Sequence, residues 1–155
     1  MKGMKRMNDT RLSKNFRLGE FVFSNIAADF GIDNTPNERQ IKNLTVLCLT
    51  VLQPIRDVLG QIDISSGFRC GKLNNHPKIR GAAHSHHRCH SGYAAADFTV
   101  RGIHNDDVLE WIRASPLPFE QLINEPSWIH ISTYRPRRQI MKAERVKGEM
   151  VYTLI

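Results

Sequence analysis

The chain of 155 residues is 41% hydrophobic and 24% charged, which excludes a disordered or fibrous protein and predicts a globular one of about one domain. Its 22 Lys and Arg residues against 15 Asp and Glu give a net charge of +7, so its surface should attract polyanions such as nucleic acid or an anionic cell wall. No apolar stretch is long enough for a signal peptide or a membrane span, so we expect synthesis in the cytoplasm without a signal peptide.

Basic residues are frequent at the start of the chain. Residues 1–14 are therefore predicted to be a loose basic segment, followed by a single domain at residues 15–155. The three cysteines, Cys48, Cys70 and Cys89, are widely spaced and odd in number, which is typical of free thiols in a reducing compartment.

A long amphipathic helix is the first clear element. Thr35 is a capping residue, and Pro36 and Glu38 suit a first helical turn. Apolar residues then recur at helical spacing up to Gly60, which should end the helix. Pro54 should kink it, because proline removes one backbone donor and crowds the preceding turn.

Strands follow this helix. Alternating apolar and polar residues predict a strand over residues 62–66, and a long polar loop then runs from Leu73 to Gly92. Helices are segregated from strands along the chain, so the predicted fold class is α+β. The later predicted elements are a strand at 93–100, a short helix at 105–114, and a hairpin with strands at 119–123 and 128–132.

Two chemistry-bearing residues lie on predicted strands. Because side chains alternate along a strand, Asp97 should lie on the face opposite Phe98. His130 should likewise lie opposite the buried Ile129 and Ile131, in a cleft. A carboxylate and an imidazole on neighbouring strands, beside a histidine-rich loop, supply the ligand types of a catalytic zinc site with three protein ligands. We therefore expect Asp97 and His130 to be two of the three zinc ligands.

The third ligand is expected from the loop. The residues alone leave it open among His84, His86, His87 and His90. His90 is seven residues before Asp97, a separation of ~23 Å on a straight strand, so the chain would have to fold back. The Ser-Gly pair after His90 can supply that bend, because glycine accepts positive φ.

Several motifs follow one another in a recognisable order. A histidine stands seven residues before Asp97, and a Trp-x-His-x-Ser strand comes later. Further motifs cover most of the chain: NFRLGEF, GIDNTP, VLQPIRDVLG, SSGFRCGKLN, GYAAADFTV, EWI and WIHIS. Together they resemble the zinc D-alanyl-D-alanine carboxypeptidase family, to which many phage endolysins belong. The resemblance implies a small antiparallel sheet with flanking helices, a fold of the hedgehog/D-Ala-D-Ala-peptidase type.

The resemblance also implies a ligand set of His90, Asp97 and His130 for Zn²⁺. The family pattern is Ser-x-His-x-x-Gly-x-Ala-x-Asp, and without a gap the serine is missing here and the glycine stands one place early. With three residues inserted, segment 85–87 would supply the Ser-x-His element, so His87 is the alternative first ligand. His90 is preferred because its seven-residue spacing is the one that fixes ligand geometry in the family.

Other residues would act beside the metal. Glu125, in the predicted hairpin loop, is the expected base that deprotonates the attacking water, with Glu120 in reserve. Arg69 resembles the family arginine that faces the active site, where a guanidinium can hold a substrate carboxylate or the oxyanion. Cys89 is a candidate soft ligand, but a thiolate would displace the expected water-open arrangement.

The expected protein is thus a zinc-dependent peptidase that cleaves peptidoglycan stem peptides, of the D-Ala-D-Ala carboxypeptidase or L-Ala-D-Glu endopeptidase type. It would be a monomeric phage endolysin, without a membrane span or a specific nucleic-acid partner, that acts on the cell wall after release. One alternative is a zinc-containing nucleic-acid-binding protein or nuclease, which predicts strong salt dependence. Another is a non-catalytic cell-wall-binding module of the same fold.

Overall fold

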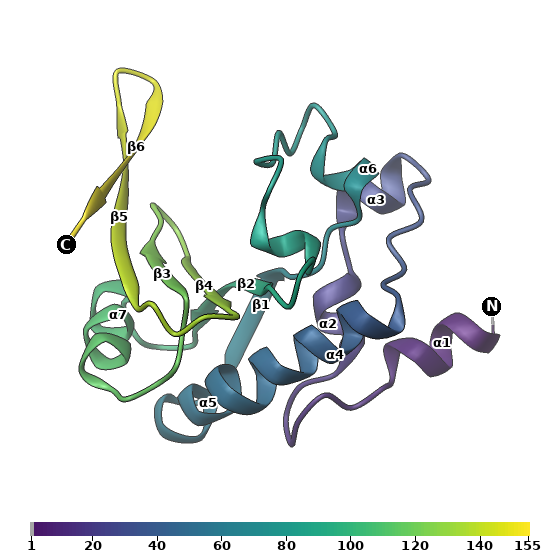
Figure 1. Ribbon diagram of the computed structural model, residues 1–155, viewed down its shortest axis with the longest axis horizontal. Coiled ribbons are helices and arrows are strands. Elements are labelled where there is room, and N and C mark those ends of the chain that lie inside the picture. The colour runs from purple at the N-terminus through teal and green to yellow at the C-terminus, as the bar shows by residue number, and fades with distance from the viewer. Residues whose placement is uncertain (1) are drawn as a thin grey trace.

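A six-stranded sheet with the strand order β1-β2-β4-β3-β5-β6 forms the centre of this computed structural model, which describes residues 2–155 (Figure 1). The strand pairs are antiparallel except for β3–β5, and helices accompany this sheet, which confirms the predicted α+β class. The strands are β1 (Ile62–Ser66), β2 (Ala94–Val100), β3 (Gln121–Asn124), β4 (Ile129–Thr133), β5 (Gln139–Val146) and β6 (Glu149–Leu154). The helices are α1 (Lys2–Asn8), α2 (Leu18–Val22), α3 (Asn25–Asp29), α4 (Glu38–Leu47), the π-helix η1 (Cys48–Leu52), α5 (Gln53–Leu59), α6 (Gly71–Asn74), the 3-10 helix η2 (His86–Arg88) and α7 (Asn105–Ala114).

The hydrophobic core lies between one face of the sheet and helices α4, η1 and α7. On β2 the side chains of Ala96 and Phe98 are fully buried in this core, and Ile131 of β4 joins them. Leu44 of α4 and Ile112 of α7 pack into the same cluster. Because strand side chains alternate, the residues between these positions, including Asp97, are left for the opposite face.

Pro54 is accommodated without ending the long helix. The π-helical turn η1 directly precedes α5, and the proline stands in the first turn of α5, where a missing backbone N–H is tolerated. The helix ends at Gly60, which has φ +101°. Its start differs from the prediction, because Asn37 and not Thr35 is the N-cap, with Gln40 completing a capping box.

The sheet is mixed, which corrects the expectation of an antiparallel one. β3 pairs with β5 in parallel, whereas the other strand pairs are antiparallel. β4 runs opposite to β3 and ends near the start of β3. The chain then crosses to the other edge of β3 and turns back, so β5 runs in the same direction as β3. Arg138, at φ +53°, makes the final bend, and its backbone N–H donates to the carbonyl of Phe119 at 3.0 Å.

The C-terminal hairpin of β5 and β6 extends the sheet beyond the predicted elements. Most of its side chains are exposed or half-buried on both faces, so the sequence lacks the apolar alternation that predicts a strand. In Figure 1 this hairpin rises from one side of the sheet, while the loop that follows α6 rises from the other.

The segment predicted at 1–14 is described from residue 2 onward. Helix α1 lies there, and the side chain of Leu12 is buried in the core. The backbone N–H of Leu18 in α2 donates to the carbonyl of Thr10 at 2.8 Å, which ties the segment to the rest of the chain. The division into this segment and a domain at 15–155 stays a prediction. Among the described residues, no helix combines the length and the apolar character needed to cross a membrane.

Candidate metal centre

Asp97 and His130 face each other on adjacent strands. They are directly paired in the register of β2 and β4, so their side chains leave the same face of the sheet. The Nδ1 atom of His130 lies 2.9 Å from Oδ1 of Asp97. This is the face opposite the core, as the alternation of both strands predicts.

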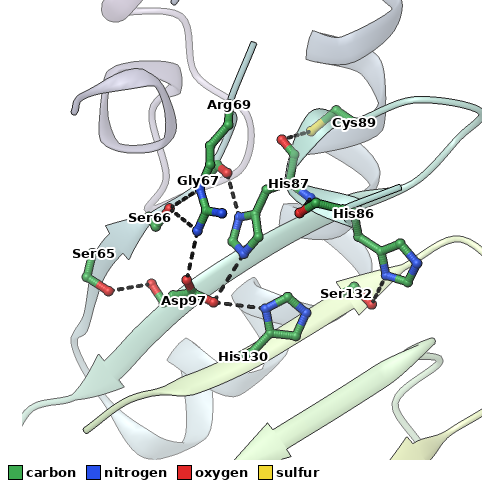
Figure 2. A network of polar contacts seen from close by, with 11 residues as sticks. Ser65, Ser66, Gly67, Arg69, His86, His87, Cys89, Asp97, His130 and Ser132 are labelled. Atoms are coloured by element: carbon green, nitrogen blue, oxygen red, sulfur yellow. Dashed lines mark hydrogen bonds and ion pairs between the residues drawn. The ribbon is translucent and has the colours of Figure 1, made fainter. Parts of the chain in front are cut away.

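His87 completes a group of three possible metal ligands (Figure 2). Its Nε2 atom lies 3.3 Å from Oδ1 of Asp97, and its ring centroid lies 5.1 Å from that of His130. One ligand atom from each of His87, Asp97 and His130 lies within 4.8 Å of the others. The Nδ1 atom of His87 lies 2.7 Å from the carbonyl oxygen of Gly67. A carbonyl only accepts, so Nδ1 carries the proton and Nε2 is free to bind a metal.

His90 does not join this group; the loop histidine that lies beside Asp97 and His130 is His87, the alternative first ligand, so His87 takes the place of His90 in the ligand set proposed below. The Nε2 atom of His90 lies 3.4 Å from the carbonyl of His84, and its ring packs against Tyr93. The physical reason is local. The turn η2 directs His87 toward Asp97, and three residues with positive φ then redirect the chain before β2: Cys89, Ser91 and Gly92.

Two local features hold His87 in place. Ser85 is the N-cap of η2, and its hydroxyl accepts a bond from the backbone N–H of His87 at 3.3 Å. Gly67 follows β1 in close contact with α2, where a Cβ atom would come within 2.7 Å of the Phe21 backbone. Only glycine fits there, and its carbonyl is the acceptor for the His87 ring.

The electrostatics of Asp97 and His87 suit metal binding. Burial by itself would raise the pKa of Asp97, but the neighbouring His87 and His130 hold that pKa well below its usual range. Burial lowers the pKa of His87, which favours the neutral imidazole. A carboxylate and a neutral imidazole are the forms in which an aspartate and a histidine bind a metal.

Arg69 stands beside the trio. Its Nη2 atom lies 3.6 Å from Oδ2 of Asp97, and Nε and Nη2 each donate to the hydroxyl of Ser66 at 3.2 Å. The Arg69 side chain is mostly buried, and burial lowers its pKa. An arginine still keeps its charge under such conditions, so the guanidinium supplies a fixed cation at the edge of the site.

A cleft of about 1140 Å³ opens over the trio. Glu125, in the β3–β4 turn, lines this cleft together with Arg69 and the three candidate ligands. Burial and the charge of Asp97 raise the pKa of Glu125, while His130 and a hydrogen bond from Tyr152 lower it, with a net rise. A carboxyl group with a raised pKa beside a metal centre is suited to proton transfer.

Other predicted candidates lie outside this centre. Glu120 is buried and bonds the backbone N–H of Arg135 at 2.9 Å and the Arg137 guanidinium at 3.3 Å, away from the cleft lining. Cys89 is buried in the core, and burial raises the pKa of its thiol to about 12, which makes a thiolate ligand unfavourable. The three cysteines are free, with no disulfide among the described residues.

Two further residues line the cleft. His86, one of the loop candidates for the third ligand, stacks on Tyr93 at a centroid distance of 4.2 Å, and its Nδ1 atom lies 2.9 Å from the hydroxyl of Ser132. Tyr152 of β6 lines the cleft and contacts Glu125. No pattern marked Tyr152, because it lies on a strand that was not predicted.

A sequence model of the family described as Peptidase M15 matches residues 14–132. The matched range ends inside β4, so it contains Arg69, Glu125 and the three candidate ligands, while β5 and β6 lie beyond it. No curated protein and no solved structure matches the chain.

Proposed function

The chain belongs to the peptidase M15 family, and from that premise we propose that it is a zinc-dependent peptidase that cleaves the stem peptides of peptidoglycan. The observation that carries the proposal is the convergence of His87, Asp97 and His130 at the floor of an open cleft. Two imidazoles and a carboxylate match the ligands of a catalytic zinc site, in which three protein ligands leave one coordination position open.

The donor set fits Zn²⁺ in its protonation as well as in its composition. The carbonyl of Gly67 holds the Nδ1 proton of His87 and leaves Nε2 directed at Asp97. Such outer hydrogen bonds fix the orientation of a ligating histidine. When bound, zinc would polarise the scissile carbonyl group and lower the pKa of a water molecule toward about 7.

Glu125 is the proposed general base. Its carboxylate takes a proton from the water molecule as the water oxygen bonds to the amide carbon. It then passes the proton to the amine nitrogen when the C–N bond breaks, so the amine leaves neutral. The raised pKa of Glu125 favours the first transfer, because a carboxylate of higher pKa is a stronger base toward the water proton.

Arg69 is proposed to bind the substrate. Its contacts with Ser66 and Asp97 fix the guanidinium at the rim of the cleft, where it can hold the amide carbonyl oxygen or a substrate carboxylate. A second hollow of about 410 Å³ lies beside the cleft and shares Arg69, Asp97 and Trp128 with it. The substrate chain could therefore extend to both sides of the cleaved bond.

The net charge of +7 suits an anionic cell wall and is compatible with a phage endolysin, which we include in the proposal. The D-Ala-D-Ala and L-Ala-D-Glu bonds are both candidates for cleavage.

The test measures the zinc content of the purified protein and its activity on two substrates, peptidoglycan and DNA. Purified protein should contain one zinc ion and release soluble peptides from peptidoglycan. A chelator should stop this release, and added zinc should restore it. Measuring the new amino ends identifies the cleaved bond. Zinc-free protein that leaves peptidoglycan intact but cleaves DNA in a strongly salt-dependent way would overturn the proposal in favour of a nuclease.

A further inference from the structure

The C-terminal hairpin forms one wall of the cleft. The opposite wall comes from residues 79–87 of the loop after α6, and the floor comes from β2, β3 and β4. Figure 1 shows the hairpin and this loop rising on opposite sides of the sheet. Residues lining the cleft from the hairpin are Met141, Lys142, Ala143, Glu144, Arg145, Met150 and Tyr152.

The strand register brings Tyr152 to Glu125. β3 and β5 are paired up to Asn124 and Lys142, so the next residue on each side is Glu125, just after the end of β3, and Ala143 of β5. Ala143 is in turn the cross-strand partner of Tyr152. Strands lie about 4.8 Å apart, so roughly 10 Å separates the backbones of the outer two residues. The small Ala143 side chain between them leaves room for a carboxyl group and a phenol to meet.

The contact itself is polar. Tyr152 and Glu125 both line the cleft, with the phenol close enough to the Glu125 carboxyl group to interact with it and the tyrosine side chain half-exposed. A phenol hydroxyl donates to a carboxylate, which is one of the stronger protein hydrogen bonds. Glu125 lies in a turn, where a side chain has several accessible rotamers, so a fixed donor selects one of them.

We propose that Tyr152 is a positioning residue that holds the Glu125 carboxylate in its catalytic orientation, so that the hairpin beyond the family-matched range is part of the active site. This rests on the proposed function of Glu125 as the base. Tyr152 acts only through Glu125 and touches neither the metal ligands nor the transferred proton. The hairpin would also restrict which substrates enter, because it closes one side of the cleft.

The experiment compares the full-length wild type with Tyr152→Phe, which removes only the hydroxyl. Loss of a hydrogen bond to a charged group should lower kcat by about tenfold, with KM changed by less than about twofold. Tyr134→Phe is the matched control, because it removes the same group from an exposed tyrosine outside the cleft lining. The control should retain wild-type kcat.

A double-mutant cycle separates positioning from a general structural effect. Glu125→Asp keeps a carboxylate but shortens the side chain, so the contact with Tyr152 is already broken. Adding Tyr152→Phe to Glu125→Asp should then lower kcat no further. Zinc content and melting temperature of each variant are measured alongside.

Each outcome decides the proposal. Equal kcat values for Tyr152→Phe and Tyr134→Phe would overturn it, as would a full tenfold loss in the Glu125→Asp background. Loss of zinc or of folding in Tyr152→Phe would also overturn it, since the role would then be structural. A wild-type protein inactive on peptidoglycan refutes the proposed function itself, which is a distinguishable result.

Discussion

Replacing His87 with alanine should abolish zinc binding, whereas the same change at His90 should leave it intact. Changes to the hydrogen-bond partners of a ligand typically weaken metal binding by about 10- to 100-fold, so loss of a direct ligand should weaken it by more than about 100-fold. His90 lies outside the trio, with its ring against Tyr93 and His84. Its removal should therefore change zinc affinity little.

The metal-free His87→Ala protein should also be less stable. The His87 ring is buried and bonds the carbonyl of Gly67, which is buried too. Truncation leaves this carbonyl without its partner, at a cost of about 1–3 kcal/mol. In a domain of this size each 1 kcal/mol lowers the melting temperature by about 2–4 °C, so a fall of about 2–12 °C is expected. His90→Ala should melt close to the wild type.

Both quantities are measured on the same preparations. Zinc affinity is obtained by titration against a competing chelator, and melting temperature by calorimetry in excess chelator. His90→Ala is the matched control, because it is the same substitution three residues further along the chain. Zinc loss in His90→Ala together with wild-type affinity in His87→Ala would refute the ligand set that the structure indicates.

Three further outcomes are expected. Glu125→Gln should retain zinc but lower kcat by about 10²- to 10⁴-fold, because a general base typically contributes that much to the rate. Peptide release at the wild-type rate would show that Glu125 is not the base. Gly67→Ala should lower the free energy of unfolding by about 1–3 kcal/mol, because the new Cβ would lie 2.7 Å from the Phe21 backbone. Chemical denaturation measures this free energy, and a denaturation midpoint equal to that of the wild type would contradict the prediction. Acid should destabilise the metal-free protein through His86, whose pKa falls from 6.5 to about 4, chiefly because burial disfavours the charged ring. The unfolded state takes up this proton first, so stability present above pH 6.5 should decline as the pH falls to about 4. His86→Gln should flatten that decline, and an unchanged pH dependence would show that another group causes it.

The sequence by itself determined the parts of the protein that are governed by local periodicity. Alternation located β1, β2 and the β3–β4 hairpin, and helical spacing located α7 with the bounds found in the structure. The order of the motifs indicated the family, which the match over residues 14–132 confirms. Alternation also placed Asp97 and His130 on the same side of their strands, because the two-residue period of a strand requires no knowledge of distant residues.

Only the tertiary structure decided which loop histidine meets this pair. Spacing along the chain favoured His90, but the direction of a side chain in an irregular loop depends on its backbone angles and on contacts with distant residues. The η2 turn and the carbonyl of Gly67 direct His87 inward. The hairpin that brings Tyr152 to Glu125 could not be predicted from the sequence either, because an exposed strand has no buried face and so lacks the alternation of apolar and polar residues.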